Sequence, residues 1–394
     1  MSEWKEYKLG EVVNILDSKR IPLSSKERSA RQGCYPYYGA QGIIDYIDDY
    51  IFDGTFLLIA EDGENLKSQK QNVAQLASGK YWVNNHAHIL ESNGKSDIRY
   101  ICYLLNTLDL SGYITGSAQP KLNQANLVKI SFKLPPLEIQ KDIADCLSVF
   151  DDKIEVNRKI NENLEQQAQA LFKSWFVDFV PFKNGRFVES ELGLIPEGWK
   201  VGKLDQVTCN ITDGVHNTVK DVANGGFYLL SCKNIKGGII TIGDHERTID
   251  GETFNKLRKR TKLQKGDILL SSVGTIGEMV LLNDDLSNIE FQRSVAIIKP
   301  DNDVITSHFL FYSLMNQKVN IIHSAHGAVQ QCLFISDIAN FSTIIPPKED
   351  IIKFTNVVKV LVDKKTTIEK ENKCLASLRD TLLPKLMSGE ISLE

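Results

Sequence analysis

A constant offset between two parts of the sequence constrains the fold more than any other feature. Six residues around a Pro-Pro pair recur 211 positions later: Gly116, Gln119, Leu122, Pro135, Pro136 and Glu138 match Gly327, Gln330, Leu333, Pro346, Pro347 and Glu349. The same offset continues without a gap to Leu171 and Leu382. Chance does not sustain one offset over such a span, so the sequence predicts two tandem copies of one unit.

Each copy is predicted to be a mixed α/β globule followed by a long helix. Short apolar runs bounded by turn residues, at 56–60, 268–272 and 295–298, are typical of strands. A Pro-Pro pair ends each globule, and helical periodicity follows both pairs. The offset is 195 at Trp4 and Trp199, which begin the copies, and it drifts inside the globules. Loops have therefore diverged in length where the helices have not.

Residues 137–178 carry a heptad seam, in which apolar positions alternate in steps of four and three. These positions are Ile143, Leu147, Phe150, Ile154, Leu164, Ala168, Leu171 and Trp175, with Asn157 and Asn161 in the middle. The second helix repeats the seam at Phe354, Val358, Leu361, Ile368, Leu375, Leu382 and Leu386, with Lys365, Asn372 and Arg379 as polar interruptions. At ~1.5 Å per residue each helix would be roughly 60 Å long. The two asparagines Asn161 and Asn372 either fix the register of the helix pair or face solvent at a poorly packed crossing.

The predicted fold class is α+β, with two tandem mixed α/β globules separated by two long helices. The helices are expected to pack as an antiparallel coiled coil, which makes the repeat pseudo-two-fold. The expected boundaries are a globule at 1–136, a helix at 137–180, a linker at 181–198, a second globule at 199–347, a second helix at 348–388 and a tail at 389–394.

The first helix has more apolar surface than one seam requires. Phe172, Trp175, Phe176 and Phe179 spread around its circumference, which predicts a further surface that packs on another chain. The residues predicted for the seam or a subunit interface are Ile154, Asn161, Leu164, Leu171, Phe172, Trp175, Phe176, Ile368, Asn372, Leu375 and Leu382.

Charge and cysteine content narrow the class of protein. The chain has 46 Lys and Arg against 50 Asp and Glu, a net charge of −4. This excludes attachment to nucleic acid by global positive charge but leaves a local basic face open. None of the seven cysteines belongs to a C-x-x-C pair, so neither a disulfide framework nor a cysteine zinc site is expected. No segment has the ~18 consecutive apolar residues of a membrane span, and a signal-peptide core is absent, so we expect a cytoplasmic, soluble protein.

No catalytic motif is complete. The Gly-Lys-Ser at 94–96 lacks the upstream glycine of a Walker loop, and neither Pro-Pro pair belongs to the tetrad of an adenine methyltransferase. His86 and His88 could bind a metal from one strand face, but without a third ligand they are more simply packing or surface histidines. The Asp-Gly-Val-His at 213–216 is first a turn signal. We therefore expect no catalytic residue and no metal in this chain.

Local charge offers candidate DNA contacts. A basic segment of the second globule contains Lys256, Arg258, Lys259, Arg260, Lys262 and Lys265, enough for several phosphate contacts unless it is simply a solvated loop. The first globule has a thinner counterpart that includes Lys19 and Arg20. The matched glutamines Gln119 and Gln330 could pair with an adenine edge, although their shared position argues equally for a structural role. His216 is the last of the candidate DNA-contacting residues.

The pattern resembles the specificity subunit of a type I restriction–modification enzyme over nearly the whole chain. The most specific segments are LFKSWFVDF at 171–179, ELGLIPEGW at 191–199 and LRDTLLPKLMSGE at 378–390. LPPLEIQ at 134–140 is similar to the start of the family's conserved helix, and IPPKE at 345–349 is a weaker copy. DGVH at 213–216 and SSVGTIG at 271–277 are similar to parts of the family's target-recognition domains, but the first globule has no clear counterpart of DGVH.

The resemblance implies that the globules recognise the two halves of an asymmetric bipartite site in double-stranded DNA. It implies that the helices set the spacer between the half-sites and that two adenine-methylating modification subunits are partners, with two restriction subunits in systems that cleave. It also implies that this chain holds no cofactor, while the complex uses S-adenosylmethionine in the modification subunit and ATP with Mg²⁺ in the restriction subunit. Two other classes stay open: a helical scaffold that holds two partner proteins apart without binding DNA, and a free-standing nuclease or methyltransferase.

Overall fold

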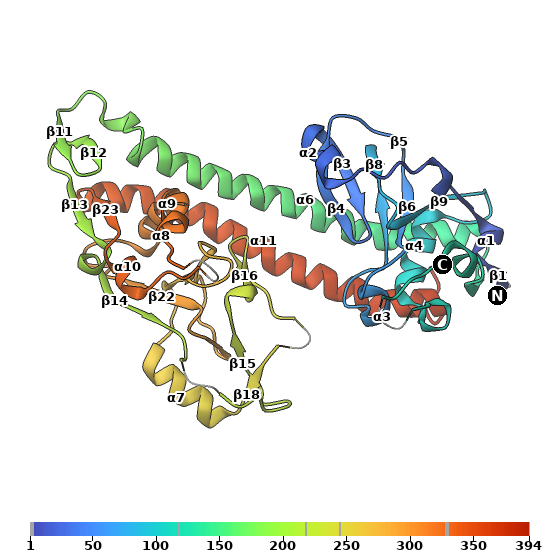
Figure 1. Ribbon diagram of the computed structural model, residues 1–394. Helices are drawn as coiled ribbons and strands as arrows, with labels where there is room; N and C mark the ends of the chain where they lie inside the picture. The colour runs from blue at the N-terminus through green and yellow to red at the C-terminus, as the bar shows by residue number, and fades with distance from the viewer. Residues whose placement is uncertain (1–3, 117–118, 217–218, 244–245, 328–330, 394) are drawn as a thin grey trace. The chain divides into compact units, whose positions relative to one another are not determined.

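The computed structural model describes residues 4–116, 119–216, 219–243, 246–327 and 331–393. The chain divides into two compact units, Met1–Val156 with Asn372–Glu394, and Asn157–Glu371. Each unit contains one globule together with part of both long helices (Figure 1). None of the described helices is long and apolar enough to cross a membrane.

The first unit is built on a four-stranded sheet in the order β2-β9-β6-β7. These strands are β2 (Val13–Ile15), β9 (Ala87–Ser92), β6 (Phe56–Ala60) and β7 (Ala74–Ala77). A second sheet has the order β4-β3-β8-β5, with β4 (Gly42–Ile47), β3 (Gln32–Gly39), β8 (Lys80–Val83) and β5 (Phe52–Asp53), and β1 (Lys5–Lys8) pairs with β10 (Ser131–Leu134). The short helices are α1 (Leu9–Val12), α2 (Ser25–Ala30), α3 (Asn65–Ser68), α4 (Ile98–Thr107) and α5 (Gln124–Leu127).

The second unit repeats this plan with a four-stranded sheet in the order β14-β22-β19-β20. These strands are β14 (Thr208–Asp213), β22 (Val295–Pro300), β19 (Ile268–Ser271) and β20 (Met279–Leu281). Its other pairings are β18 (Thr248–Ile249) with β15 (Phe227–Leu230) and β21 (Ile289–Phe291), β16 (Ile235–Lys236) with β17 (Ile239–Ile240), and β13 (Lys200–Lys203) with β23 (Ser342–Ile345). The helices are α7 (Gly251–Thr261), α8 (Ser307–Asn316), α9 (Lys318–His323) and α10 (Ile335–Ala339).

The two sheets confirm the tandem repeat at the level of strand register. In the first, Leu57 pairs with Leu90, and in the second Leu269 pairs with Ile297, each between the two central antiparallel strands. The mixed sheets also correspond, because β3 is parallel to β8 and β15 is parallel to β21. The predicted strands at 56–60, 268–272 and 295–298 are β6, β19 and β22.

The two long helices are α6 (Leu137–Phe176) and α11 (Lys348–Ser388), drawn in green and red in Figure 1. Within the second unit they are antiparallel, because Asn157 donates to Glu371 at 2.9 Å while Lys365 binds Glu165 at 2.9 Å. Within the first unit Asp151 contacts Arg379. Lys365 and Arg379, the charged interruptions of the predicted seam on α11, are thus each paired with an acidic residue of α6.

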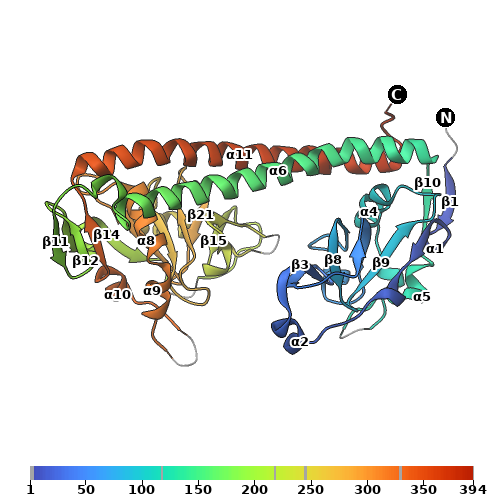
Figure 2. The same cartoon turned by 90° about the horizontal axis from the view of Figure 1, so that it is seen from above.

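Each globule packs its sheet and one helix on the seam of the helix pair. In the first unit α4 lies between the sheet and the helices (Figure 2), and Ile143 and Leu147 of α6 share a core with Leu386 of α11. In the second unit Phe354 and Val358 of α11 occupy the matching place, 211 positions later. These residues follow the predicted seam. At the end of α6, however, the buried stripe runs through Ala168, Phe172 and Phe176, while the predicted seam residues Leu171 and Trp175 are half-buried.

The prediction that Phe172 and Phe176 face another chain is wrong. Their exposed fractions are 3% and 2%, and both belong to the core of the second unit. Phe176 lies 4.8 Å from Phe309 of α8 and 5.1 Å from Phe354 of α11, measured between ring centroids. The end of α6 is thus surrounded by elements of its own chain, which helical periodicity alone does not show. Trp175 is half-buried at the edge of the same cluster.

The segment between α6 and β13 is more ordered than the expected linker at 181–198. The α-helix ends at Phe176 rather than near 180, and Phe179 takes a left-handed conformation with φ of 52°. The chain then forms a hairpin of β11 (Phe187–Ser190) and β12 (Gly193–Pro196). Ring contacts of Phe179 and Phe182 with Trp199 attach this segment to the second unit.

The two seam asparagines differ in burial. Asn161 is buried and its Oδ1 has no hydrogen-bond partner among the described residues, whereas Asn372 is half-buried. Neither is a fully solvated side chain. Their proposed role in fixing register stays a prediction.

Candidate nucleic-acid interface

The turn at 292–294, which connects β21 to β22, has a tightly held backbone. The Gln292 N–H donates to the Leu230 carbonyl at 2.8 Å, and the Arg293 N–H donates to the Val215 carbonyl at 3.1 Å. On the other side the Ser294 carbonyl accepts from the Ser272 N–H at 2.9 Å. Three chain segments therefore fix this turn at one end of the second unit's sheet.

A cavity of about 640 Å³ opens at this end of the sheet. Its lining comes from the turn at 292–294, from Asp213 and His216 after β14, and from the segment 332–335. Among these, Arg293, His216 and Phe334 are exposed. The cavity is thus polar on one wall and apolar on the other.

The Asp-Gly-Val-His segment is a structural turn that borders this cavity. A Cβ at Gly214 would lie 2.0 Å from the Phe291 carbonyl oxygen, so only glycine allows the two backbones to approach. His216 Nε2 contacts Asp213 Oδ2 at 2.7 Å. Arg260 donates to the carbonyls of Asp213, at 2.7 Å, and of Gly214. The acid and histidine form a local pair at the end of this turn.

The predicted basic segment is mostly helical. It spans α7, which Asp250 caps by accepting from the Thr253 N–H at 2.8 Å, and the residues that follow. Lys256, Lys259, Lys262 and Lys265 are exposed. These four lysines therefore remain candidates for contacts with DNA phosphates.

Arg258 does not fit the prediction of a DNA contact, because its guanidinium group points into the domain. It pairs with Glu290, whose side chain is fully buried, and it donates to the carbonyls of Leu286 and Ile289 at 2.7 Å each. Burial raises the pKa of Glu290, and Arg258 together with Thr261 opposes that rise. Arg258 therefore neutralises a buried carboxylate instead of contacting DNA.

Arg20 in the first unit is a second correction. Its guanidinium group binds Glu61 at 2.8 Å, Asp17 at 3.4 Å and the Ala87 carbonyl at 2.9 Å. Its side chain is 15% exposed. Lys19 beside it is exposed and keeps its candidate role.

The same network engages His88, one of the two histidines considered as metal ligands. Nδ1 of His88 contacts Asp17 Oδ2 at 2.6 Å and Nε2 contacts the Leu122 carbonyl at 2.7 Å. Burial would raise the pKa of Asp17, but the hydrogen bonds from His88 and from the Ile89 N–H hold it below its usual value.

Asp17, Glu61 and His88 place one ligand atom each within 4.8 Å of one another. These atoms are already used in ion pairs and hydrogen bonds with neighbouring residues, so the cluster is an internal charge network. His86 is outside it, half exposed and paired with Asp62 at 2.7 Å.

The predicted glutamines lie in the loops that the repeat matches. Gln119 is exposed, two residues before Lys121, whose Nζ binds Glu61 at 3.2 Å. Gln330 lies outside the described residues. The structure thus gives one of the pair a surface position and says nothing of the other.

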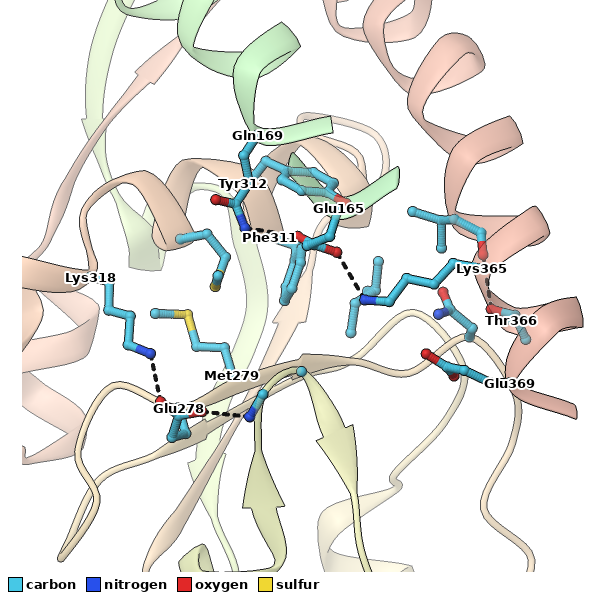
Figure 3. Close-up of a pocket in the computed structure, with 16 residues that line it drawn as sticks. Glu165, Gln169, Glu278, Met279, Phe311, Tyr312, Lys318, Lys365, Thr366 and Glu369 are labelled. Carbon is cyan, nitrogen blue, oxygen red and sulfur yellow. Dashed lines mark hydrogen bonds and ion pairs between the residues drawn. The ribbon is translucent and has the colours of Figure 1, made fainter. Parts of the chain in front are cut away.

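A second cavity, of about 260 Å³, lies within the second unit between α6, α11, α8 and β20 (Figure 3). Its charged groups are paired across it: Lys365 binds Glu165 at 2.9 Å and Lys318 binds Glu278 at 2.6 Å. Burial alone would raise the pKa of Glu278, but the hydrogen bonds from Lys318 and the Gly237 N–H, together with the nearby positive charge, hold it below its usual value. The first pair joins α11 to α6, and the second joins α9 to the residue before β20, so the charged groups of both pairs hold the fold.

Gln292 and Arg293 are the site residues that sequence reasoning missed. The available signal was a short polar stretch, Gln-Arg-Ser, directly before the strand at 295–298. A search for clusters of basic residues in the sequence favoured α7 and overlooked Arg293, which has no basic neighbour in the sequence.

The comparisons agree with this architecture. The family model for the type I restriction modification DNA specificity domain matches residues 1–166 and 196–374. The MjaIX specificity subunit of Methanocaldococcus jannaschii is 30% identical over the whole chain and 97% of its own length, and a putative type I specificity subunit of Haemophilus influenzae is 28% identical over 90% of this chain and 86% of its own. The crystal structure of a type I S subunit from M. genitalium has the same fold, with a TM-score of 0.60 at 16% identity over 98% of this chain and 96% of that one. The chain therefore belongs to the family of type I restriction–modification specificity subunits.

Proposed function

We propose that this chain binds double-stranded DNA and recognises an asymmetric bipartite sequence, one half with each globule. The observation that carries the proposal is the repeated sheet, because β2-β9-β6-β7 and β14-β22-β19-β20 share one topology while the loops at the same end differ. One fold used twice suits one kind of task performed twice. Different loops suit two different half-sites.

Local charge supports DNA binding despite the net charge of −4. Lys256, Lys259, Lys262 and Lys265 are exposed on and after α7, where they can contact phosphates and release counterions. Arg260, which is 46% exposed, anchors the end of this helix to the turn beside the cavity. Phosphate contacts on α7 and base contacts at the cavity would then be neighbours.

The long helices are proposed to set the spacer between the half-sites and to bind two methyltransferase subunits. Val149 on α6 and Val360 on α11 are equivalent in the repeat, 211 positions apart, and are 65% and 67% exposed. An apolar side chain left exposed at the same place in both copies suits two identical partners. The catalytic chemistry then belongs to the partners, with S-adenosylmethionine in the modification subunit and ATP with Mg²⁺ in up to two restriction subunits.

The proposal is tested by co-expressing the chain with its methyltransferase subunit and sequencing host DNA for methylated adenines. We expect one asymmetric bipartite motif that disappears when this chain is deleted. A stable complex that methylates no defined motif would instead favour a scaffold that does not bind DNA specifically. Affinity for a cognate duplex should fall steeply as salt rises.

The docking of the partners has a separate test. We expect Val149→Asp and Val360→Asp each to remove one methyltransferase subunit, and the double variant to remove both, as measured by native mass spectrometry. Gln166→Glu, at an exposed and uncharged position on α6, is the control that adds the same single negative charge. Full stoichiometry in the double variant would place the docking surface elsewhere.

A further inference from the structure

One arginine of the second globule is not used to hold the fold. Of the four arginines in 199–347, Arg247 binds Asp221, Arg258 binds Glu290, and Arg260 donates to two carbonyls. Arg293 is exposed, and its guanidinium group forms no hydrogen bond or ion pair with any described residue.

The neighbouring Gln292 has the same character. Its backbone N–H is held by Leu230, yet its side-chain amide makes no hydrogen bond within the described part of the chain, and it lines the 640 Å³ cavity. A rigid backbone that carries two unengaged polar head groups loses little entropy when those groups bind a ligand. The turn is therefore preorganised for recognition.

The chemistry of the two side chains matches base edges. A guanidinium fork donates two parallel hydrogen bonds to N7 and O6 of guanine, and a glutamine amide can pair with N6 and N7 of adenine in the major groove. Lysine presents a point charge and lacks this fork. The lysines of α7 are thus suited to phosphate and the turn at 292–294 to bases.

Resting on the proposed function, we propose that the Gln292–Arg293 turn is a base-reading element of the second globule and that Arg293 contacts the major-groove edge of a guanine in the second half-site. The Gln292 side chain contacts the adjacent base pair. The first half-site is recognised independently, since the equivalent end of the first sheet is occupied by the network of Arg20, Asp17 and Glu61.

The test compares three variants in the full complex with the methyltransferase subunits. Arg293→Ala removes the fork and the charge, Arg293→Lys keeps the charge and removes the fork, and Lys259→Ala removes a predicted phosphate contact. Each complex is assayed by methylation motif in host DNA and by competition with duplexes in which every base pair of both half-sites is changed in turn.

We expect both Arg293 variants to lose about 10- to 100-fold of the discrimination at one guanine of the second half-site, with the first half-site unchanged. We expect Lys259→Ala to weaken binding to all sequences alike. The slope of the logarithm of affinity against the logarithm of salt concentration should become shallower by about one unit, the value for one phosphate contact. Arg293 is exposed, so its variants should unfold at the wild-type temperature, which is checked by calorimetry.

Three outcomes would overturn the inference. They are unchanged preference at every position in Arg293→Ala, an equal loss on all sequences in that variant, and dissociation of its methyltransferase subunits. A wild-type complex that yields no bipartite motif would refute the proposed function itself, and the inference with it.

Discussion

Replacing Arg258 by alanine tests whether this residue holds the fold or contacts DNA. The side chain of its partner Glu290 is fully buried, and Thr261 Oγ1 donates to both carboxylate oxygens at 3.1 Å. Removing one member of a buried ion pair costs about 3–5 kcal/mol, because the remaining charge stays unneutralised. Arg258 itself is 25% exposed, so we expect the lower value, about 3 kcal/mol. For a unit of this size that lowers the melting temperature by about 6–12 °C.

The pH dependence of this loss follows from the pKa of Glu290. Burial already raises that pKa, and removing Arg258 raises it further. A carboxyl group whose folded pKa lies above its unfolded value favours the fold when protonated, and this contribution is lost as pH rises through the folded pKa. The loss in free energy of unfolding caused by Arg258→Ala should therefore be largest at neutral pH and become smaller as the pH falls towards about 4.

The assay is calorimetry of the full chain, with hydrogen exchange over α7 assigning the change to the second unit. Lys259→Ala is the matched control, since it alters an exposed neighbour and should change stability by no more than about 0.5 kcal/mol. Arg258→Met combined with Glu290→Gln should recover most of the loss, because no charge remains buried. If Arg258→Ala keeps the wild-type melting temperature while DNA affinity and its salt dependence fall, the assignment of Arg258 to the fold is wrong.

Further predictions concern other buried contacts. Hydrogen bonds keep the pKa of Asp17 low in the folded state, so the ionised carboxylate stabilises the fold above about pH 4 and this contribution is lost as pH falls through the folded pKa. In Asp17→Asn the free energy of unfolding of the first unit should therefore fall less steeply as the pH is lowered. Arg20→Ala should cost about 2–3 kcal/mol in thermal unfolding while Lys19→Ala costs almost nothing, and equal effects would contradict the network. Phe176→Ala should destabilise the second unit by about 3–5 kcal/mol, and a soluble, stable variant would mean that the ring faces outward after all. Asn161→Leu should raise the free energy of unfolding by about 1 kcal/mol, measured by denaturant titration, since it removes a buried carbonyl oxygen without a partner among the described residues. A loss of stability would show that the asparagine is satisfied in solution.

The architecture was predictable because the sequence repeats itself at a fixed offset and places apolar residues at helical spacing. The repeat offset of 211 gave the two copies, and the steps of four and three located the two long helices α6 and α11. Phe172 and Phe176 show where this reasoning stops. An apolar residue off the seam predicts some contact, but not whether the contact is with the same chain, because that depends on how α8 and Trp199 close around the helix end.

The candidate site was only partly predictable, because charge in a sequence does not reveal the direction of a side chain. Arg258 and Lys259 are neighbours in α7, yet one turns inwards to a buried carboxylate and the other is exposed. The partner of Arg258 is 32 positions away, at Glu290. Arg293 was missed for the opposite reason, since its isolation from other basic residues hid it while the fold leaves its guanidinium group available.

The equivalent ends of the two sheets differ, which is what the proposed recognition of two different half-sites requires. Each four-stranded sheet is buried on both faces, by α4 or α8 and the long helices on one side and by the second sheet of its own unit on the other. In the first unit that end is filled by Arg20, Glu61 and Asp17, whereas in the second it is a cavity beside Gln292 and Arg293. The two units keep the same sheet order although these ends differ, so the sheet order does not depend on which arrangement is present. The asymmetric target proposed above requires two ends that differ in this way, and the exposed turn at 292–294 is the place where a substitution should alter the proposed recognition at little cost in stability.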